Sequence, residues 1–267
     1  MLNSQVTQTI AQSLDDAEKG KNQIPQLHLT YPTMDINDAY QIQRCWVEKK
    51  VADGRRIIGR KVGLTSKAMQ VSVGINEPDY GVLLDDMQLM EGSDIPISRF
   101  IEPRIEVELA FVLGKPLQGP HCSMLDVLSA TDYIVPAIEV IDSRIQRVDT
   151  NIGGTRTIVD SISDNAANAG IVMGGRPIRP MDKDLRWISA LLSRNGQIEE
   201  SGVAAGVLGH PAQSVAWLAN KLSEYGTTLQ SGEIILSGSF TRAIFCYSGE
   251  TYCADYGSLG TVSFRFV

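Results

Sequence analysis

The residues with the clearest capacity for chemistry are two glutamates, Glu106 and Glu108, within residues 105–113. Apolar side chains alternate along this segment, so a strand would send both glutamates to one face, with their Cα atoms roughly 7 Å apart. Such a pair can bind a cation, but it is also common on the solvated face of an antiparallel sheet. The same face continues with Ala110 and Val112, which argues against a purely solvated surface.

A third carboxylate, Glu139, lies within the apolar run of residues 133–141. A run of this composition is expected to be buried, and a buried carboxylate without a counter-charge would be costly. Three convergent carboxylates with no His or Cys nearby in the sequence favour a hard cation, Mg²⁺ or alternatively Mn²⁺, over zinc. An ion pair with Arg104 or Arg144 could equally neutralise Glu139, so the sequence leaves both explanations open.

Other reactive residue types form no recognisable site. His28, His121 and His210 are isolated from one another, and the four cysteines are scattered without a C-x-x-C pair, so we expect reduced, structural thiols. The pair Gly174 and Gly175 lacks the strand–GxGxxG–helix context of a dinucleotide site. We therefore expect no catalytic histidine and no nicotinamide cofactor.

The elements that must position the carboxylates begin with helices. Apolar residues recur at helical spacing in residues 5–20 and 37–52, and Asp35 or Asn37 can cap the second helix. Another helix is predicted over residues 210–225. From about residue 56, β-branched runs bounded by Gly, Pro, Asp and Ser predict strands; these cover residues 56–64, 105–113, 133–141, 233–236 and 261–267.

Two connections can also be predicted. The pair Asn195 and Gly196 is favoured in two-residue hairpins and would join residues 187–193 to residues 197–201. Residues 144–156, which are weakly patterned and contain two adjacent glycines, are predicted to form a mobile loop.

Composition restricts the classes of function. A chain of 267 residues with 43% apolar residues can bury a sizeable core. Its net charge of −7, without a basic block, argues against nucleic acid as a partner. No apolar run approaches the roughly 20 residues that span a bilayer, and the first twenty residues are too polar for a signal peptide, so we expect a cytoplasmic protein without a membrane partner.

Several longer motifs point to one family. They are GRKVGLTSK at residues 59–67, EPDYG at 77–81, PRIEVEL at 103–109, EVIDSR at 139–144, SISDNAANAG at 161–170 and DLRWISA at 184–190. Together they resemble the hydratase/decarboxylase branch of the fumarylacetoacetate hydrolase superfamily. The resemblance extends over nearly the whole chain, and it is more specific for the branch than for the substrate.

The resemblance implies an α+β fold with a mixed β-roll or sandwich core and a helical N-terminal portion. It implies residues 1–75 packed on a catalytic domain of residues 76–267, which can also count as one domain, and assembly into homo-oligomers. It further implies Mg²⁺ held by an E-x-E pair and one later glutamate, beside a lysine and an acid. Position by position, these residues fall on Glu106, Glu108 and Glu139 for the metal, and on Lys61 and Asp79 for catalysis.

The implied activity is metal-dependent hydration of a small-molecule 2-oxo acid in aromatic catabolism of the homoprotocatechuate type. The expected substrate is 2-oxohept-4-ene-1,7-dioate, or its 2-hydroxy-2,4-dienoate tautomer, and the product is 4-hydroxy-2-oxoheptanedioate. A chelated metal can polarise the ketone as a Lewis acid. We assign Asp79 to water activation or proton shuttling, because a carboxylate in a partly dry pocket can have a raised pKa, and Lys61 to electrostatic support or protonation.

Other activities remain open at this point. A 2-oxopent-4-enoate hydratase and a 4-oxalocrotonate decarboxylase would use the same metal, but decarboxylases of the family often carry an apolar residue where Asp79 stands. A C–C bond hydrolase would need a His–Glu pair early in the chain, which the isolated His28 does not supply. A non-catalytic subunit that stabilises a partner is the alternative from a different class, and turnover by the purified chain separates it from an enzyme.

A seven-carbon dioate would also need a cation for its second carboxylate, and a bidentate arginine suits that task. Arg242 is the candidate, because it follows a Gly/Ser turn after an apolar strand, where loops commonly carry binding groups. A plain surface arginine is the simpler interpretation of that position, and Lys67, Arg144 and Arg156 are competitors for the role.

Overall fold

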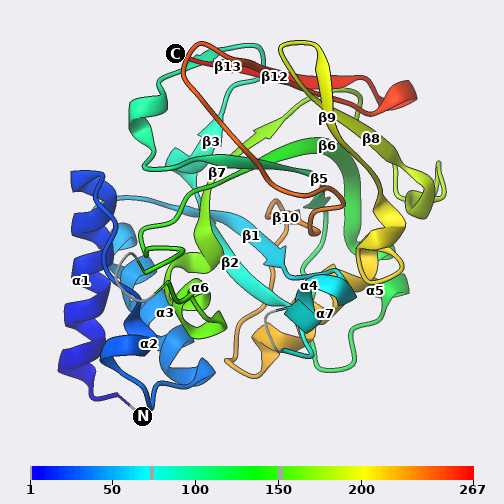
Figure 1. The fold of residues 1–267 in the computed structure, drawn as a ribbon. Helices are drawn as coiled ribbons and strands as arrows, with labels where there is room; N and C mark the ends of the chain where they lie inside the picture. Colours follow the sequence, from blue (N-terminus) through cyan, green and yellow to red (C-terminus); the bar gives the residue numbers. More distant parts are fainter. Residues whose placement is uncertain (1, 73–74, 150–152) are drawn as a thin grey trace.

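The computed structural model describes residues 2–72, 75–149 and 153–267. Three helices lie together on one side of the molecule: α1 (Ser4–Gly20), the short α2 (Leu27–Thr30) and α3 (Ile36–Ala52) (Figure 1). The side chain of Asp35 accepts a hydrogen bond from the Asp38 amide at the start of α3, in a reciprocal capping box. Both long N-terminal helices were predicted from their apolar spacing, and both are confirmed.

The larger of two sheets carries the predicted carboxylate strands. Its strands lie in the spatial order β2 (Asp79–Leu84), β1 (Ile57–Gly63), β10 (Ile234–Leu236), β5 (Arg104–Leu113), β6 (Thr131–Ile141), β7 (Asn168–Met173) and β3 (Gln88–Leu89), and β11 (Ile244–Phe245) also pairs with β5. The pairs β1–β10 and β3–β7 are parallel, and the other pairs are antiparallel. This sheet is therefore mixed, as expected.

The smaller sheet lies above the larger one in Figure 1. Its order is β4 (Asp94–Ile95), β13 (Thr261–Phe266), β12 (Thr251–Asp255), β8 (Ser189–Arg194) and β9 (Gln197–Val203). The predicted hairpin joins β8 to β9, and Asn195 and Gly196 both have positive φ, as a two-residue hairpin of this kind requires.

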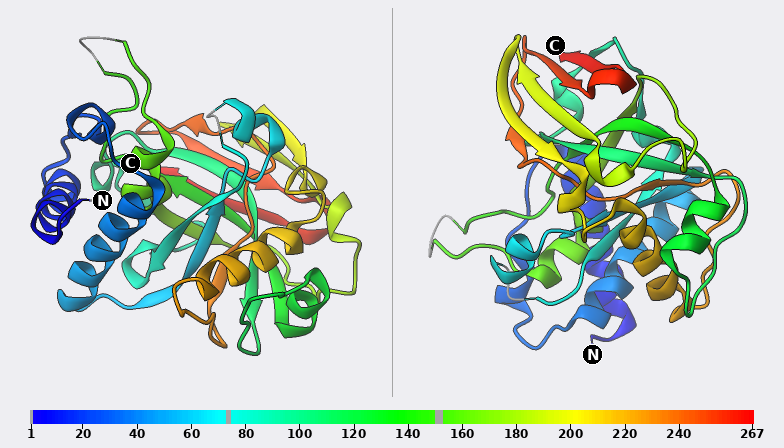
Figure 2. Two further views of the ribbon diagram at one scale, coloured as in Figure 1. Left: turned by 90° about the horizontal axis from the view of Figure 1, so that it is seen from below. Right: turned by 90° about the vertical axis from the view of Figure 1, so that its right-hand side faces the viewer.

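The remaining helices flank the larger sheet. They are α4 (Lys67–Ser72), α5 (Met124–Ala130), α6 (Ile158–Ser163) and α7 (Pro211–Ser223). Short 3₁₀ turns cover Asp85–Met87, Ile97–Arg99, Asn165–Ala167, Leu185–Trp187, Ala204–Gly206 and Gly257–Leu259. Helix α7 packs against α5 on the side away from α1 and α3 (Figure 2). It was predicted from its apolar stripe, and His210 caps it by accepting a hydrogen bond from the Ala212 amide.

Side-chain amides join the β2 edge of the larger sheet to the segment that leads into β7. The Val82 amide donates to Asn165 Oδ1 over 2.7 Å, and Asn165 Nδ2 donates back to the Val82 carbonyl over 2.9 Å. Asn168 Nδ2 donates to the same carbonyl over 3.0 Å. Because β2 and β7 stand far apart in the strand order, these bonds show that the sheet curls into a roll with an enclosed interior.

One face of the curled sheet packs in the main hydrophobic core, and the other face carries a smaller apolar cluster. That cluster consists of Leu83, Ala110, Val112, Val135, Ala137, Ile171, Ile234 and Leu236. Glu106 and Glu108 lie on the same face of β5 as Ala110, by strand alternation. The interior of the roll therefore has an apolar end and a charged end.

The expected domain boundary and the predicted loop both concern how the chain is organised. The larger sheet contains β1 and β2 on either side of residue 75, so the division of the chain near that residue stays a prediction. The predicted loop of residues 144–156 includes 150–152, which lie outside the described residues. Within the described chain, no helix is both long and apolar enough to cross a bilayer.

Candidate active site

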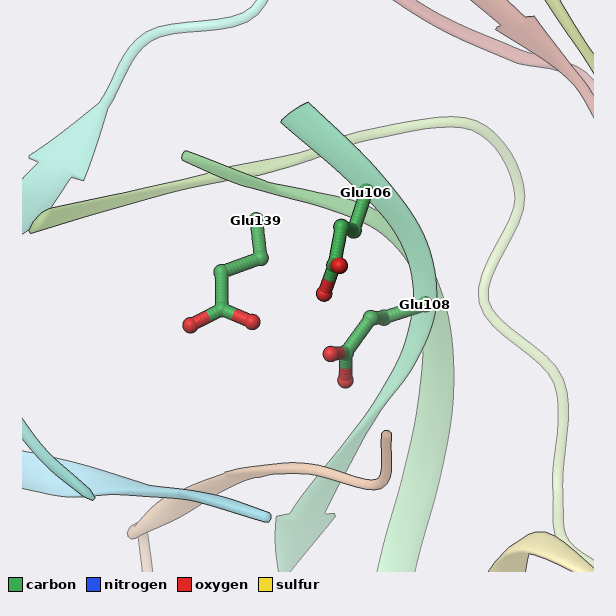
Figure 3. A group of neighbouring side chains, drawn as sticks. All are labelled: Glu106, Glu108 and Glu139. Atoms are coloured by element: carbon green, nitrogen blue, oxygen red, sulfur yellow. The ribbon is translucent and has the colours of Figure 1, made fainter. Parts of the chain in front are cut away.

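The pairing of β5 with β6 brings the three predicted glutamates together. Glu106 lies directly opposite Glu139 in the ladder, and Glu108 lies opposite Ala137. One carboxylate oxygen from each glutamate lies within 4.8 Å of the other two. Figure 3 shows the three carboxylates directed toward a common space between the strands.

These carboxylates have few partners in the protein. Glu108 and Glu139 are buried, whereas Glu106 is partly exposed. The Gly238 amide donates to Glu108 Oε2 over 2.7 Å. Neither carboxylate oxygen of Glu139 has a hydrogen-bond partner among the described residues, and its nearest cation is Lys61, whose Nζ lies 3.3 Å from Oε1.

The electrostatics of the cluster are unfavourable without a further cation. Burial and the neighbouring Glu139 raise the pKa of Glu106 to about 7, and burial with the same neighbour raises the pKa of Glu108 well above its usual range. Burial also raises the pKa of Glu139. Burial would lower the pKa of Lys61, but the surrounding carboxylates, Glu139 first, raise it above its usual value, so the lysine is held as a cation.

The antiparallel pairing of β1 with β2 places Asp79 beside Lys61. Gly63 lies opposite Asp79 in this ladder, and a Cβ atom at Gly63 would stand only 2.2 Å from Asp79 Oδ1. Glycine therefore leaves the space into which the Asp79 carboxylate folds. Asp79 is only 3% exposed, its Oδ1 has no hydrogen-bond partner, and burial raises its pKa against the opposing effect of Lys61.

A pocket of about 380 Å³ opens onto this cluster. It is lined by Lys61, Gly63, Leu64, Met69, Asp79, Arg104, Glu106, Ile141, Arg147, Val148, Thr155, Arg156, Thr157, Ile158, Ser161, Ala166 and Ala167. The set unites both predicted catalytic residues, one predicted metal ligand and three arginines. A small anionic molecule could thus reach the carboxylate cluster from solvent.

The three arginines of the pocket differ in their partners. The guanidinium carbons of Arg104 and Arg147 lie 5.6 and 5.5 Å from the ring centroid of Phe245. Burial and the two neighbouring arginines lower the pKa of Arg104 to about 10. Arg156 instead donates from Nη1 to the Ser143 hydroxyl.

The structure does not bring Arg242 to this pocket. Its side chain is 85% exposed and its Nη2 lies 2.7 Å from Glu200 Oε1. Arg144 is buried and donates from Nε to Asp164, so it does not neutralise Glu139, and it does not line the pocket. Of the competitors considered for a second carboxylate, Arg156 alone lines the pocket; Lys67, at the start of α4, does not.

Sequence reasoning missed Arg104 and Arg147 as pocket residues. The sequence marks Arg104 as a possible ion-pair partner of Glu139, although its place two residues before Glu106 predicts that it shares the face of Glu106. Arg147 carries no comparable signal, because it lies in an irregular segment. His28 does not line the pocket, and its Nδ1 lies 2.7 Å from Oδ2 of the buried Asp160.

The donor set suits a hard divalent cation. Carboxylate oxygens are the ligands that Mg²⁺ and Mn²⁺ prefer, and no cysteine or histidine joins the described metal-ligating group. The buried oxygens of Glu139 that lack hydrogen-bond partners are groups that a cation would satisfy. The residues present therefore fit a bound divalent metal ion.

Comparison with known proteins places the chain among related enzymes. Residues 56–267 match the family described as fumarylacetoacetate (FAA) hydrolase C-terminal. The chain is 60% identical to 2-oxo-hept-4-ene-1,7-dioate hydratase of Escherichia coli, over 97% of each chain. It is 39% identical to 2-keto-4-pentenoate hydratase of Paraburkholderia xenovorans (strain LB400), over 96% of this chain and 93% of that one.

Among solved structures, the chain is similar to 4-oxalocrotonate decarboxylase from Pseudomonas putida G7, complexed with magnesium and adipate. The TM-score is 0.95 and the sequence identity is 36%, over 100% of this chain and 99% of the other. The curled sheet and the flanking helices thus form the fold of this group, in agreement with the α+β class expected from the sequence.

Proposed function

This chain belongs to the fumarylacetoacetate hydrolase family, and from that premise we propose that it is a metal-dependent hydratase of 2-oxo acids. The proposed substrate is 2-oxohept-4-ene-1,7-dioate, because the name of the similar Escherichia coli enzyme gives this compound as its substrate. The observation that carries the proposal is the convergence of three carboxylates beside Lys61 and Asp79 at the base of one pocket.

The proposed metal ligands are Glu106, Glu108 and Glu139. A divalent ion in their midst would polarise the 2-oxo group as a Lewis acid. Magnesium is the proposed ion, since the similar decarboxylase was solved with magnesium, and manganese is the alternative. The bond from the Gly238 amide orients one oxygen of Glu108, and the cross-strand pairing fixes the other two glutamates face to face.

Lys61 and Asp79 are the groups proposed for proton transfer and for stabilising negative charge. Hydration adds the oxygen of water to C4 of the substrate and a proton to a neighbouring carbon, so one group must take a proton from water and one must give a proton to carbon. Asp79 suits this proton transfer, because burial raises the pKa of its carboxyl and because its Oδ1 has no hydrogen-bond partner among the described residues. Lys61 stays cationic and stabilises negative charge that develops on the substrate.

Decarboxylation is the second candidate, because the overall fold is shared with a decarboxylase. Loss of CO₂ needs no group that activates water, whereas this chain buries a carboxylate beside the lysine. Hydration is therefore favoured. Product analysis separates the two, because hydration keeps all carbons of the substrate and decarboxylation releases one as CO₂.

Replacing Glu108 by Gln tests the metal site. Glu108→Gln should lower Mg²⁺-dependent turnover by about 100-fold or more, because even residues that merely support a metal ligand contribute about 10- to 100-fold. Turnover of 2-oxohept-4-ene-1,7-dioate and Mg²⁺ binding by calorimetry are the measurements. The exposed Glu48→Gln is the matched control and should behave as the wild type. Unchanged activity in Glu108→Gln would remove this residue from the ligand set.

Replacing Asp79 by Asn separates chemistry from binding. Asp79→Asn should lower hydration by about 100- to 10,000-fold, the usual contribution of a general acid or base, while metal binding remains. The control is Asp132→Asn, at an exposed position outside the pocket. Wild-type turnover in Asp79→Asn would exclude an essential proton transfer at this carboxyl, and accumulation of CO₂ by the wild-type protein would favour decarboxylation.

A further inference from the structure

We propose that Arg104 and Arg147 hold the second carboxylate of a dicarboxylic substrate and so make the pocket selective for 2-oxo dioic acids over 2-oxo monoacids. This inference rests on the proposed function, because it concerns the far end of the same substrate. It differs from the sequence-based choice of Arg242, which lies exposed and paired with Glu200.

Position along the strand is the first argument. Arg104 and Glu106 lie on the same face of β5, roughly 7 Å apart along the strand. The two carboxyl carbons of an extended seven-carbon dioate are six carbon–carbon bonds apart, which is of similar length to this spacing. A dioate whose 2-oxo end lies at the glutamates therefore has its second carboxylate within reach of the arginines at the pocket wall. A five-carbon monoacid is shorter and carries no carboxylate at its far end.

The lack of protein partners is the second argument. Among the described residues, no carboxylate lies within ion-pair distance of the guanidinium of Arg104 or Arg147. Both guanidinium groups lie against the ring of Phe245, a contact that leaves their N–H groups available to an anion. Phe245 lies opposite Arg104 in the pairing of β11 with β5, so the sheet holds the backbone that carries the ring.

The third argument is charge. Arg104, Arg147 and Arg156 line one pocket, and guanidinium groups so close to one another repel. Arg156 is bonded to Ser143 and lies near the carboxylates of Asp79 and Asp164, which offset its charge. The carboxylates of Glu106 and Glu102 offset part of the charge of Arg104, but among the described residues neither Arg104 nor Arg147 has a carboxylate within ion-pair distance. A carboxylate between them would relieve the repulsion and accept several charge-assisted hydrogen bonds.

The test compares two substrates in three variants. Arg104→Met, Arg147→Met and the double variant keep an unbranched, flexible side chain and remove the guanidinium and its charge. Each should raise KM for 2-oxohept-4-ene-1,7-dioate by about 10- to 100-fold, the usual effect of losing a hydrogen bond to a charged group, and should change KM for 2-oxopent-4-enoate by about twofold or less. Arg242→Met is the matched control, because that arginine lies outside the pocket, and it should leave both KM values unchanged.

A second measurement does not depend on turnover. In the presence of Mg²⁺, the wild-type protein should bind adipate more tightly than hexanoate, which lacks the second carboxylate, and Arg147→Met should abolish the difference. If Arg104→Met does not fold, as judged by thermal unfolding, Arg147→Met and Arg104→Lys carry the test, with the lysine restoring charge but not bidentate geometry.

The outcomes separate the two proposals. Equal effects of the arginine variants on both substrates, or a wild-type preference for the monoacid, would overturn the inference and leave hydration in place. Absence of turnover on either substrate, together with arginine-dependent adipate binding, would overturn the proposed function and support the carboxylate site.

Discussion

The two ends of the roll interior are built from the same strands and differ in what those strands carry. At one end, Ala110 of β5 lies opposite Val135 of β6, and Val112 belongs to the same apolar cluster. At the other end, the next alternating positions of β5 are Glu106 and Glu108. The backbone pairing is continuous between the two ends, so the change from packing to chemistry lies in the side chains alone.

This difference shows that one sheet can bury charged side chains, and that the burial raises the pKa values of their carboxyl groups. The apolar end packs closely and supports the register of the strands. The charged end contains carboxylates whose pKa values are raised by burial and by Glu139, so ionising them in the folded protein is unfavourable, and a bound cation would offset this. Within the roll interior, the apolar end thus contributes packing, and the charged end carries the groups proposed to act in catalysis, as expected when active-site groups are held in unfavourable surroundings.

Neutralising part of the charged end should have the largest effect on activity and the opposite effect on stability. Glu106→Gln should reduce Mg²⁺-dependent turnover by about 100-fold or more, because a proposed ligand of the metal is lost. The same change should raise the melting temperature of the metal-free protein by about 2–4 °C, since a relieved repulsion of about 1 kcal/mol has that effect in a chain of this size. Thermal unfolding in EDTA and turnover in Mg²⁺ measure the two effects.

A lower melting temperature of metal-free Glu106→Gln would contradict the view that ionising the carboxylates of the charged end is unfavourable. Addition of Mg²⁺ should reduce the advantage of the variant, because the wild-type protein gains more from the ion. A ligand at 100 times its dissociation constant stabilises by about 2.7 kcal/mol, which is enough to reverse the order of the two melting temperatures.

A cavity at the apolar end should affect stability and spare the metal site. Leu83 is fully buried in β2 within the apolar cluster. Leu83→Ala should lower the free energy of unfolding by about 2–5 kcal/mol, from lost burial and the remaining cavity. Urea denaturation gives this value, and Mg²⁺ affinity measured by calorimetry should change by about threefold or less. A large loss of Mg²⁺ affinity would mean that the two ends are coupled.

The smallest expected effect concerns the boundary between the two ends. The hydroxyl of Tyr256 lies 2.5 Å from the Ala137 carbonyl and 2.8 Å from the Glu108 carbonyl, and it accepts a bond from the Ala137 amide. Tyr256→Phe removes these hydrogen bonds to buried backbone groups and should lower the free energy of unfolding by about 1–3 kcal/mol. Mg²⁺ affinity should fall by about tenfold or less, because the Glu108 carboxylate itself is unchanged.

Calorimetric titration of Tyr256→Phe with Mg²⁺ makes this measurement, and Tyr247→Phe, at an exposed position, is the control. An affinity loss as large as that of Glu106→Gln would show that Tyr256 aligns the metal ligands, in place of the milder role expected here.

The sequence predicted the parts of this site that depend on local pattern. Alternation in residues 105–113 placed Glu106 and Glu108 on one face, and the apolar run around Glu139 indicated burial; both are confirmed. Strand β2 was not predicted, although its residue Asp79 was named from a motif. The proximity of Asp79 to Lys61 depends on a non-local pairing and on the space at Gly63, which a one-dimensional pattern does not contain.

The surroundings of the arginines also depend on contacts between distant parts of the chain. The environment of Arg104 is determined by β11, which joins the sheet from a distant part of the chain and places Phe245 opposite it. The Gly/Ser turn before Arg242 is a local signal, which predicts a loop and does not determine the direction of the side chain. Homo-oligomeric assembly, also expected from the sequence, stays a prediction.

The parallel pairing of β1 with β10 bears on how this protein is made. During synthesis β1 and β5 leave the ribosome long before β10, the strand that lies between them and bonds to both. Until β10 emerges, each of them presents an unpaired edge with apolar side chains, and such edges are prone to pair with other chains. The growing chain therefore exposes these two edges for most of its synthesis, and the larger sheet closes only when β10 inserts between β1 and β5.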